Sequence, residues 1–382
     1  MLRLLPLAII DLWRRNRRRT ILTVLAVAAA TVVFSATTVI PYVMNAIVED
    51  ADRSPRLAIT NRAGFDRTLP ESYYWKIARV PGVLAVNRMT WFGGIYDDPT
   101  HQFPSMGIDA DNPDQIWPEY ALNHELVVKF KNTRDAAIVG TATMRRFGWR
   151  TGDMVSLRNP DIPLTLTFRI IGTIDQGPDL TIFLFQRDYM EEALHRPGQV
   201  SMLWVRCARL DDVSRIAAVI DAMFRNSSAE TRTETEKAFM AEMVSTYGPL
   251  ARIVQGIGMA AVLAIALAVL NAASMSVRER THEVAVLKSL GFTGAQILTG
   301  LAVESGVASL AGGLIGIAAA CALMDQLRGF FPTFGPLLSF GLPAPVMGGG
   351  LAIAIAVGLI AGVAPAIGTI RSSVAGALRK VA

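Results

Sequence analysis

Four apolar runs, each long enough to cross a lipid bilayer, constrain this sequence more than any other feature. They lie at residues 20–40, 250–275, 301–324 and 346–370. Because about 20 mostly apolar residues cross the hydrocarbon core, and backbone polar groups find no water there, each run is expected to be a helix. The sequence therefore predicts an α-helical membrane protein whose four transmembrane helices lie in a lipid bilayer.

The basic segment before the first run, residues 1–19, has two interpretations. It is either an amphipathic helix at the cytoplasmic interface or a basic flank that only orients the next span. A cleaved signal peptide is the alternative for the whole region. We favour an uncleaved first transmembrane helix at residues 20–44, because the basic region and the apolar core are both longer than those of a signal peptide.

Residues 45–246, between the first and second runs, have the pattern of a separate domain, and about 200 residues are enough to bury a hydrophobic core. Alternating apolar and polar residues between turn-forming residues predict short strands. The expected strands include residues 57–60, 83–89, 164–171 and 202–207. We expect the last strand to return to the first part, which makes about residues 131–196 a β-rich insert. This predicts an α+β extracytoplasmic domain inserted between the first and second spans.

Positive charge is concentrated beside the apolar runs. The net charge is +5, but 52% of the residues are hydrophobic and only 18% are charged, so we do not interpret the positive charge as a nucleic-acid site. Basic residues gather before the first run, between the second and third runs, and at Arg371, Arg379 and Lys380. The positive-inside rule then predicts a multi-pass membrane protein, with both termini and the segment between the second and third runs cytoplasmic and with residues 45–246 on the outer side.

The segment between the second and third spans, residues 277–300, is called the elbow here. It is too short to form a domain, and both of its ends lead directly into apolar runs. Its charged side chains include Glu279, Arg280, Glu283 and Lys288. A charged segment held this close to a bilayer is expected to be a contact surface.

The middle of the elbow carries the signals of a helix that ends and a second helix that begins. Gly291 is placed to end the first helix in the left-handed conformation that glycine adopts without strain. Thr293 and Gln296 have the spacing of a capping box, and Phe292 and Ile297 occupy the positions of a hydrophobic staple. The sequence therefore predicts two helices joined by a short, rigid break.

No catalytic motif is present. The sequence contains no GxxxxGK[ST] phosphate loop, no HExxH metal motif and no GxSxG nucleophile motif. The segment from Asp109 to Asp114 is interpreted as a capped turn rather than a calcium loop, because Pro113 occupies a ligand position. Cys207 and Cys321 lie in different surroundings, so no disulfide is expected. We therefore expect no enzyme activity, no metal and no cofactor in this chain.

Glycines recur in the third and fourth spans, two pairs of them at four-residue spacing. They are Gly306, Gly312, Gly316, Gly358 and Gly362. Small residues at this spacing let helices approach closely, although glycine is also frequent in membrane spans in general. We favour close helix packing. Glu304 is the only charged residue in these two runs, which disfavours an ion pathway through them.

Several stretches of the chain follow one known pattern. They are Arg280 to Gly291, Ile297-Leu298, Glu304-Ser305, Gly312 to Gly316, Gly140 to Asp153, and the tail from Gly362 to Arg379. Together they resemble the FtsX/MacB-type ABC transporter permeases. The resemblance implies an FtsX-like permease domain at residues 247–382, with three transmembrane helices, and a MacB-like periplasmic core domain at 45–246. The chain departs from the pattern at Val374, where the family has proline, and it lacks the ATPase fused to MacB-type members.

The resemblance implies a permease subunit of the mechanotransmission type in the bacterial inner membrane, with residues 45–246 periplasmic. A separate cytoplasmic ATPase subunit would bind ATP and Mg²⁺, and its movement would reach the periplasmic domain to export or release a lipid-like molecule, a lipoprotein or a small molecule. A second permease chain, identical or different, would complete the membrane part, with a periplasmic adaptor and an outer-membrane channel as further partners. The alternatives are an FtsX-like signalling scaffold for a partner such as a cell-wall hydrolase, and a membrane-anchored binding protein without a motor.

The resemblance also implies that the elbow docks on the ATPase. The residues that would couple to it are Glu279, Arg280, Glu283, Val284, Leu287, Lys288 and Gly291. The charged side chains would make the polar contacts, and the two aliphatic ones would form an apolar anchor. The alternative is that these charges are only solvated.

Overall fold

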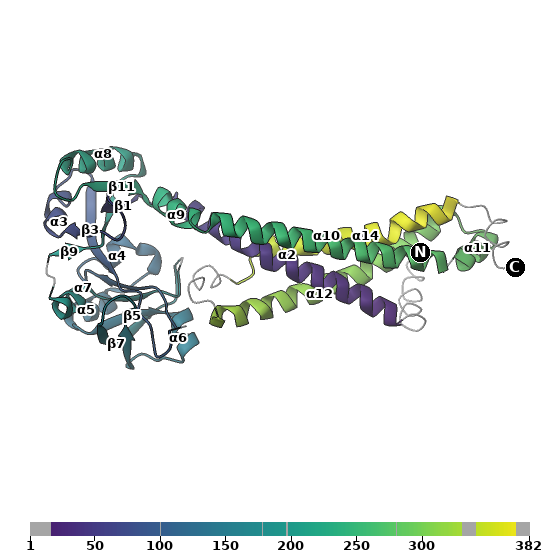
Figure 1. Ribbon diagram of the computed structural model, residues 1–382, viewed down its shortest axis with the longest axis horizontal. Coiled ribbons are helices and arrows are strands. Elements are labelled where there is room, and N and C mark those ends of the chain that lie inside the picture. Colours follow the sequence, from purple (N-terminus) through teal and green to yellow (C-terminus); the bar gives the residue numbers. More distant parts are fainter. Residues whose placement is uncertain are drawn as a thin grey trace. The chain divides into compact units, whose positions relative to one another are not determined.

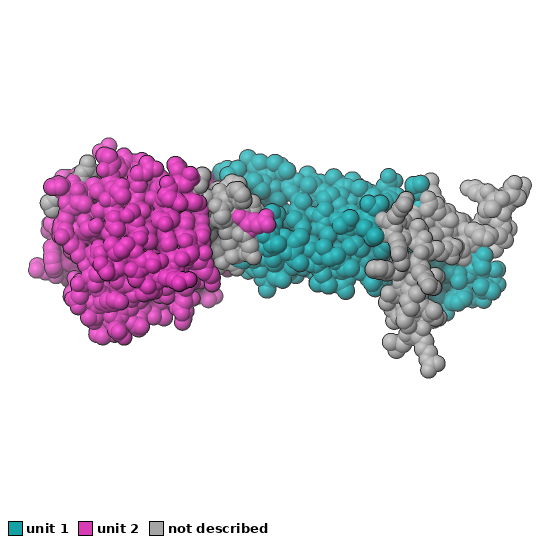
Figure 2. All heavy atoms as spheres, turned by 90° about the horizontal axis from the view of Figure 1, so that it is seen from below, with its two compact units in different colours: residues 1–42, 248–325, 341–382 teal, residues 43–247, 326–340 magenta. Residues whose placement is uncertain are grey.

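The computed structural model describes residues 17–99, 101–177, 179–195, 198–279, 281–330 and 341–371. The interfacial helix expected at residues 1–19 lies outside the described residues except for its last three positions, and so does the tail after residue 371. The chain divides into two compact units (Figure 2). One, here the helical unit, comprises residues 1–42, 248–325 and 341–382, and the other, here the α+β domain, comprises residues 43–247 with 326–340.

Four long helices and one short helix, α11, make up the described part of the helical unit. They are α2 (Arg17–Ala51), α10 (Gly248–Glu279), α11 (Thr281–Ser289), α12 (Gly294–Phe330) and α14 (Ala344–Arg371). All except α11 contain a stretch apolar and long enough to cross a membrane, so four candidate spans lie among the described residues, as predicted. The first helix continues past residue 44 to Ala51 and contains Pro41 within its length.

The α+β domain, which contains the strands labelled in Figure 1, is built on one mixed sheet. The strand order is β11-β1-β10-β3-β4-β8-β5-β7-β6. Its strands are β1 (Arg56–Asn61), β3 (Val83–Trp91), β4 (Ser105–Ile108), β5 (Ala136–Gly140), β6 (Met154–Arg158), β7 (Thr165–Ile174), β8 (Phe183–Gln186), β10 (Met202–Cys207) and β11 (Thr231–Thr235). A separate pair joins β2 (Leu69–Pro70) to β9 (Gln199–Val200).

Short helices cover the sheet and lead back towards the helical unit. They are α3 (Ser72–Ile77), α4 (Pro113–Ile116), η1 (Pro118–Tyr120), α5 (His124–Asn132), α6 (Thr141–Phe147), α7 (Arg187–Leu194), η2 (Leu210–Asp212), α8 (Val213–Met223) and α9 (Glu236–Ser245). The buried side of α8 carries Val213, Ile216 and Ile220 at helical spacing.

The β-rich insert does not form a layer of its own. As predicted, β10 returns to the first part, where it pairs antiparallel with both β1 and β3. The strands of the insert extend the same sheet instead, because β8 pairs parallel with β4 in the register Ser105 to Phe183. The sheet therefore has a first half, β11 to β3, and a β-rich half, β8 to β6, with β4 between them.

The two faces of this sheet are packed differently. On one face a single core runs across both halves and includes Trp204 of β10 and Ile138 of β5. We call it the shared face. The opposite face carries two separate cores, one under α3 and α8 with Tyr73 stacked on Phe224 at 3.8 Å, and one rich in phenylalanine in the β-rich half. We call it the divided face.

The cysteines are unpaired, as predicted. Cys207 is buried in the core of the first half, and burial, together with the nearby charge of Asp212, raises the pKa of its thiol to about 11. Because the thiolate is the reactive form, this thiol is expected to be inert at neutral pH.

Candidate functional site

The elbow ends its first helix in a Schellman motif. Gly291 has a φ of +94°, a conformation that L side chains rarely adopt. The N–H of Phe292 donates to the carbonyl oxygen of Leu287 at 3.1 Å, and the N–H of Gly291 donates to that of Lys288 at 3.1 Å. These are the paired bonds that close a helix carboxyl end around a left-handed residue. The helix end predicted at Gly291 is therefore present with its full hydrogen-bond pattern.

The second helix begins with the predicted capping box. The N–H of Thr293 donates to Oε1 of Gln296 at 2.9 Å, and the N–H of Gln296 donates to Oγ1 of Thr293 at 3.3 Å. With the bond from Leu290 N–H to the carbonyl of Val286, every backbone N–H from residue 290 to 293 is hydrogen-bonded. The join between α11 and α12 therefore has no free backbone donor at which it could bend easily.

The apolar surface of the elbow differs from the predicted anchor of Val284 and Leu287. Val284 is only 6% exposed, because it lies on the side of α11 that packs against the chain itself, so it offers little to a partner. Leu287 is exposed, and it belongs to a strip that the sequence reasoning missed. The strip consists of Val286, Leu287, Leu290 and Phe292. The spacing 286, 287, 290 on a helix was the signal that could have found it.

The charged residues of the elbow are placed only in part. Glu279 ends α10 and Glu283 lies in α11, but the structure describes their backbone and not their side chains, and Arg280 lies outside the described residues. Lys288 is half-buried in the last turn of α11. Whether these residues contact a partner stays a prediction.

The glycines of α12 lie where other helices pass closely. A β-carbon at Gly312 would lie 2.8 Å from the carbonyl oxygen of Val24 in α2, and one at Gly316 would lie 2.7 Å from that of Ala28. Such distances are shorter than real β-carbons allow, so only glycine lets α2 approach at these positions. Gly306 is different, because its nearest neighbour is Leu359 at 4.0 Å and a side chain would fit there.

The glycines of α14 face serines of α12. A β-carbon at Gly358 would overlap with Ser309, and one at Gly362 would overlap with Ser305. A third close approach, missed by the sequence reasoning, joins Gly258 of α10 to Thr37 of α2. Close packing therefore joins α12 to α2 and α14, and α10 to α2.

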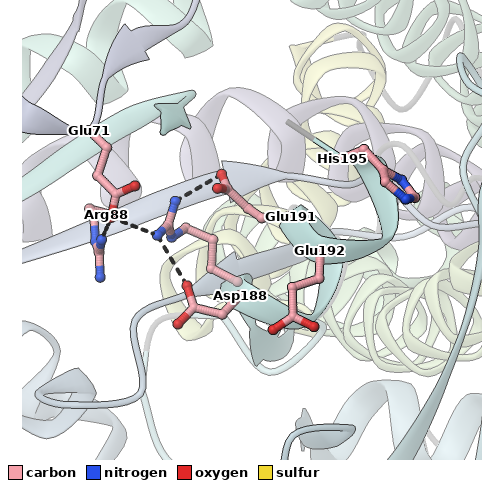
Figure 3. A pocket seen from close by; sticks show the side chains of 7 residues that line it. Glu71, Arg88, Asp188, Glu191, Glu192 and His195 are labelled. Atoms are coloured by element: carbon pink, nitrogen blue, oxygen red, sulfur yellow. Dashed lines mark hydrogen bonds and ion pairs between the residues drawn. The ribbon is translucent and has the colours of Figure 1, made fainter. Parts of the chain in front are cut away.

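In the α+β domain, a cluster of charged side chains lines a cavity of about 610 Å³ on the divided face (Figure 3). Its centre is Arg187, the first residue of α7, whose side chain is 2% exposed. The lining residues are Glu71, Arg88, Arg187, Asp188, Glu191, Glu192 and His195. They come from both halves of the sheet, so the cavity lies on the seam between the two cores.

Carboxylates surround both arginines of this cluster. Arg88 Nε lies 2.8 Å from Asp109 Oδ2, and Arg88 Nη1 also contacts Glu71. Arg187 Nη2 lies 3.2 Å from Glu71 Oε1, and Arg187 Nη1 lies 2.8 Å from Glu191 Oε1. Asp109, the first residue of the turn singled out in the sequence, thus serves as the partner of these guanidinium groups.

Two family models match the chain. The FtsX-like permease C-terminal model matches residues 256–374, and the MacB-like periplasmic core domain model matches residues 20–223. The second match covers more than half of the chain, and the two together cover most of it.

Three similar proteins are described as uncharacterised ABC transporter permeases. The chain is 23% identical to an uncharacterised ABC transporter permease of Methanocaldococcus jannaschii over 62% of this chain and 60% of the relative. It is 35% identical to the permease YknZ of Bacillus subtilis over 34% of this chain and 29% of the relative, and 26% identical to YvrN of the same organism over 52% of each. The chain thus matches less than two thirds of the length of each of these relatives.

The chain is also similar to solved structures of extracytoplasmic domains. The extracellular domain of YknZ from Gram-positive bacteria matches 47% of this chain and 99% of that one, with 12% identity and a TM-score of 0.35. The periplasmic region of MacB from Actinobacillus actinomycetemcomitans matches 50% and 92%, with 12% identity and a TM-score of 0.35.

Proposed function

This chain belongs to the ABC transporter permeases of the MacB/FtsX type, and we propose that it transmits force from a separate ATPase subunit to its own α+β domain. A cytoplasmic ATPase subunit binds ATP and Mg²⁺, and the elbow receives its movement. A second permease chain pairs with this one in the inner membrane. The α+β domain, on the periplasmic side, exports or releases a lipid-like molecule, a lipoprotein or a small molecule.

The rigid join in the elbow is the observation that carries the proposal. Because the backbone donors of residues 290–293 are all bonded, bending this join breaks hydrogen bonds that each contribute about 1 kcal/mol. A push on α11 is therefore passed to α12, a helix of 37 residues, rather than absorbed at Gly291.

The exposed strip of the elbow supports docking on a partner. Leu287, Leu290 and Phe292 are apolar and exposed beside the half-buried Lys288. In the proposed cytoplasmic position, this strip gains free energy by entering an apolar groove, as amphipathic helices do when they bind. Glu279, Arg280, Glu283 and Lys288 would then orient the elbow in that groove through charge complementarity.

The packing of the helical unit favours force transmission over conduction between the spans. The close approaches at Gly312 and Gly358 join α12 to α2 and to α14 with no room for side chains. The candidate spans also carry few charged groups that could guide a polar substrate. The cargo is therefore handled by the α+β domain, not by a path among the helices.

The double substitution Glu283→Lys with Leu287→Asp tests the docking surface. We expect the protein to insert in the membrane but to lose both co-purification with the ATPase and ATP-dependent function. Val128→Asp, which places the same new charge at an exposed aliphatic position of α5 in the α+β domain, is the matched control. If the double variant retained the ATPase and full function, the elbow would not be the coupling element.

A further inference from the structure

A buried arginine lies where the chain enters the α+β domain. Arg56 is the first residue of β1, shortly after α2 ends at Ala51, and it is 5% exposed. Its Nε lies 2.7 Å from Oε2 of Glu236, and its Nη2 lies 2.8 Å from Oε1 of the same carboxylate. This is the two-bond fork that guanidinium and carboxylate groups form when their planes align.

The remaining nitrogen of the guanidinium joins a third segment. Arg56 Nη1 donates to the carbonyl oxygen of Ile116 at 2.8 Å and lies 2.6 Å from Oε1 of Glu119. Burial by itself lowers the pKa of Arg56, but the bonds and charges of Glu236 and Glu119 outweigh it and raise that pKa. The group therefore stays charged, and each of its nitrogens has a partner.

Glu236 lies where the chain leaves the domain. It is the first residue of α9, whose amino end is capped by Thr235 Oγ1, which accepts from the N–H of Ala238 at 3.1 Å. The helix ends at Ser245, and α10 of the helical unit begins at Gly248. Arg56 and Glu236 are 180 positions apart in sequence, so their fork joins the segment that follows α2 to the segment that precedes α10.

The segment formed by α4 and η1, which contacts Arg56, leads to the β-rich half of the sheet. Ile116 and Tyr120, which flank Glu119, belong to the core of the shared face, together with Ile138 and Ile171 of the β-rich strands. Tyr120 also packs directly on Gly177, in the loop that follows β7, where a β-carbon would overlap with its ring. A displacement of Arg56 is therefore transmitted through side chains in contact to the far half of the domain.

We propose that Arg56 is the joint through which movement of the two helices that enter and leave the α+β domain reaches its β-rich half. This rests on the proposed function, because it assigns a route within the domain for the force that the helices deliver. Arg56 acts as a positioning residue: it holds β1, α9 and the α4–η1 segment as one rigid piece. Without its fork, α9 would move while the β-rich half stayed behind.

Two pairs of spin labels on the full-length permease with its ATPase, reconstituted in nanodiscs, test this proposal. The first pair replaces Met243 of α9 and Met154 of β6, which are both exposed. The second pair replaces Leu267 of α10 and Met154. Cys321 is first replaced by alanine, whereas Cys207 stays because it is buried. Label distances are measured with and without ATP.

In the native background, we expect the distance between labels 243 and 154 to be narrow and unchanged by ATP, because the domain moves as one piece. The distance between labels 267 and 154 should shift with ATP. Arg56→Lys keeps the charge and loses the fork. In this variant we expect the first distance to broaden and to change with ATP, and the shift of the second distance to be lost.

Further variants keep the test decisive. Glu119→Ala removes the side-chain contact to η1 and leaves the buried fork with Glu236 intact, so it should decouple the halves in the same direction even if Arg56→Lys unfolds. Arg232→Gln, which breaks two exposed ion pairs of β11, should behave like the native protein. Native-like distances in both Arg56→Lys and Glu119→Ala would overturn the role of Arg56 alone. Absence of any ATP-dependent shift in the native background would overturn the proposed function as well.

Discussion

Among the described residues, each face of the sheet in the α+β domain buries one arginine, and the bonding of the two arginines differs. Arg56, on the shared face, is 5% exposed and all of its nitrogens are engaged by Glu236, Glu119 and a carbonyl oxygen. Arg187, on the divided face, is 2% exposed, yet its Nε and Nη1 have no well-aligned hydrogen bond although carboxylates lie close to them. A cavity of about 610 Å³ lies beside Arg187.

The difference shows that burial alone does not decide how much a buried arginine stabilises the packing around it. A buried ion pair stabilises only when its geometry is good and its remaining donors are bonded. Arg56 meets both conditions, so its contacts form a fixed joint. Arg187 has more carboxylates around it but poorer alignment and a cavity to move into, so the seam between the two separate cores is the easier place for the domain to deform.

The largest expected effect comes from removing the fixed joint. Arg56→Met leaves the carboxylate of Glu236 buried without its partner, and we expect the α+β domain to lose about 3–5 kcal/mol of unfolding free energy. Chemical denaturation of the full-length protein in detergent, followed by tryptophan fluorescence, measures it. A loss no larger than that of the matched variant Arg187→Met would remove the contrast between the two faces.

Arg187→Met should have a smaller effect. Glu71 and Asp109 keep Arg88 as a partner, and Asp188 is exposed to water, so only Glu191 loses its main counter-charge. We expect a loss of about 1–2 kcal/mol in the same denaturation experiment. A loss as large as that of Arg56→Met would mean that the divided face is held as firmly as the shared one.

The pH dependence of stability sharpens the comparison further. Burial raises the pKa of Glu191, an effect that the charge of Arg187 only partly offsets. The folded state therefore binds a proton more tightly than the unfolded state does, and this contribution to stability is lost as pH rises through the folded pKa of Glu191. The unfolding temperature of the native protein should therefore fall as pH rises just above the usual carboxyl pKa, and Glu191→Gln should reduce this fall in thermal unfolding scans. The same pH profile in both proteins would show that Glu191 is not the group responsible.

The smallest effect is expected at an exposed arginine. Arg232 of β11 lies 2.7 Å from Glu234 Oε1 and 2.5 Å from Glu242 Oε2 in ion pairs exposed to solvent. Because exposed pairs of this kind contribute about 0.2–1 kcal/mol, Arg232→Gln should change the unfolding free energy only within that range. A larger loss would show that the number of ion pairs, rather than their burial, sets the ranking.

The elbow could be predicted from sequence because its signals are local. Gly291, Thr293 and Gln296 form their hydrogen bonds within a few residues of one another, so their spacing determined the helix end and the capping box. The side of α11 that faces the chain depends on the packing of distant helices. For that reason Val284 was interpreted as part of an exposed anchor and is instead buried.

Features that depend on distant pairing could not be predicted in the same way. The joint at Arg56 requires Glu236, which is 180 positions away, and nothing in the spacing of either residue indicates the other. The β-rich insert was recognised as strands, but its parallel pairing with β4 depends on a contact that no local pattern encodes. Among the helix glycines, the spacing did not separate Gly312, where only glycine fits, from Gly306, where a side chain fits.

The place of β1 in the sheet has a consequence for biosynthesis. Both of its neighbours, β10 and β11, are the last strands of the sheet to emerge from the ribosome. Until they arrive, strand Arg56–Asn61 has no partner along either edge, and unpaired strand edges of nascent chains favour aggregation. The sheet therefore cannot be completed from the amino end of the domain onward, because its first strand waits for its last two.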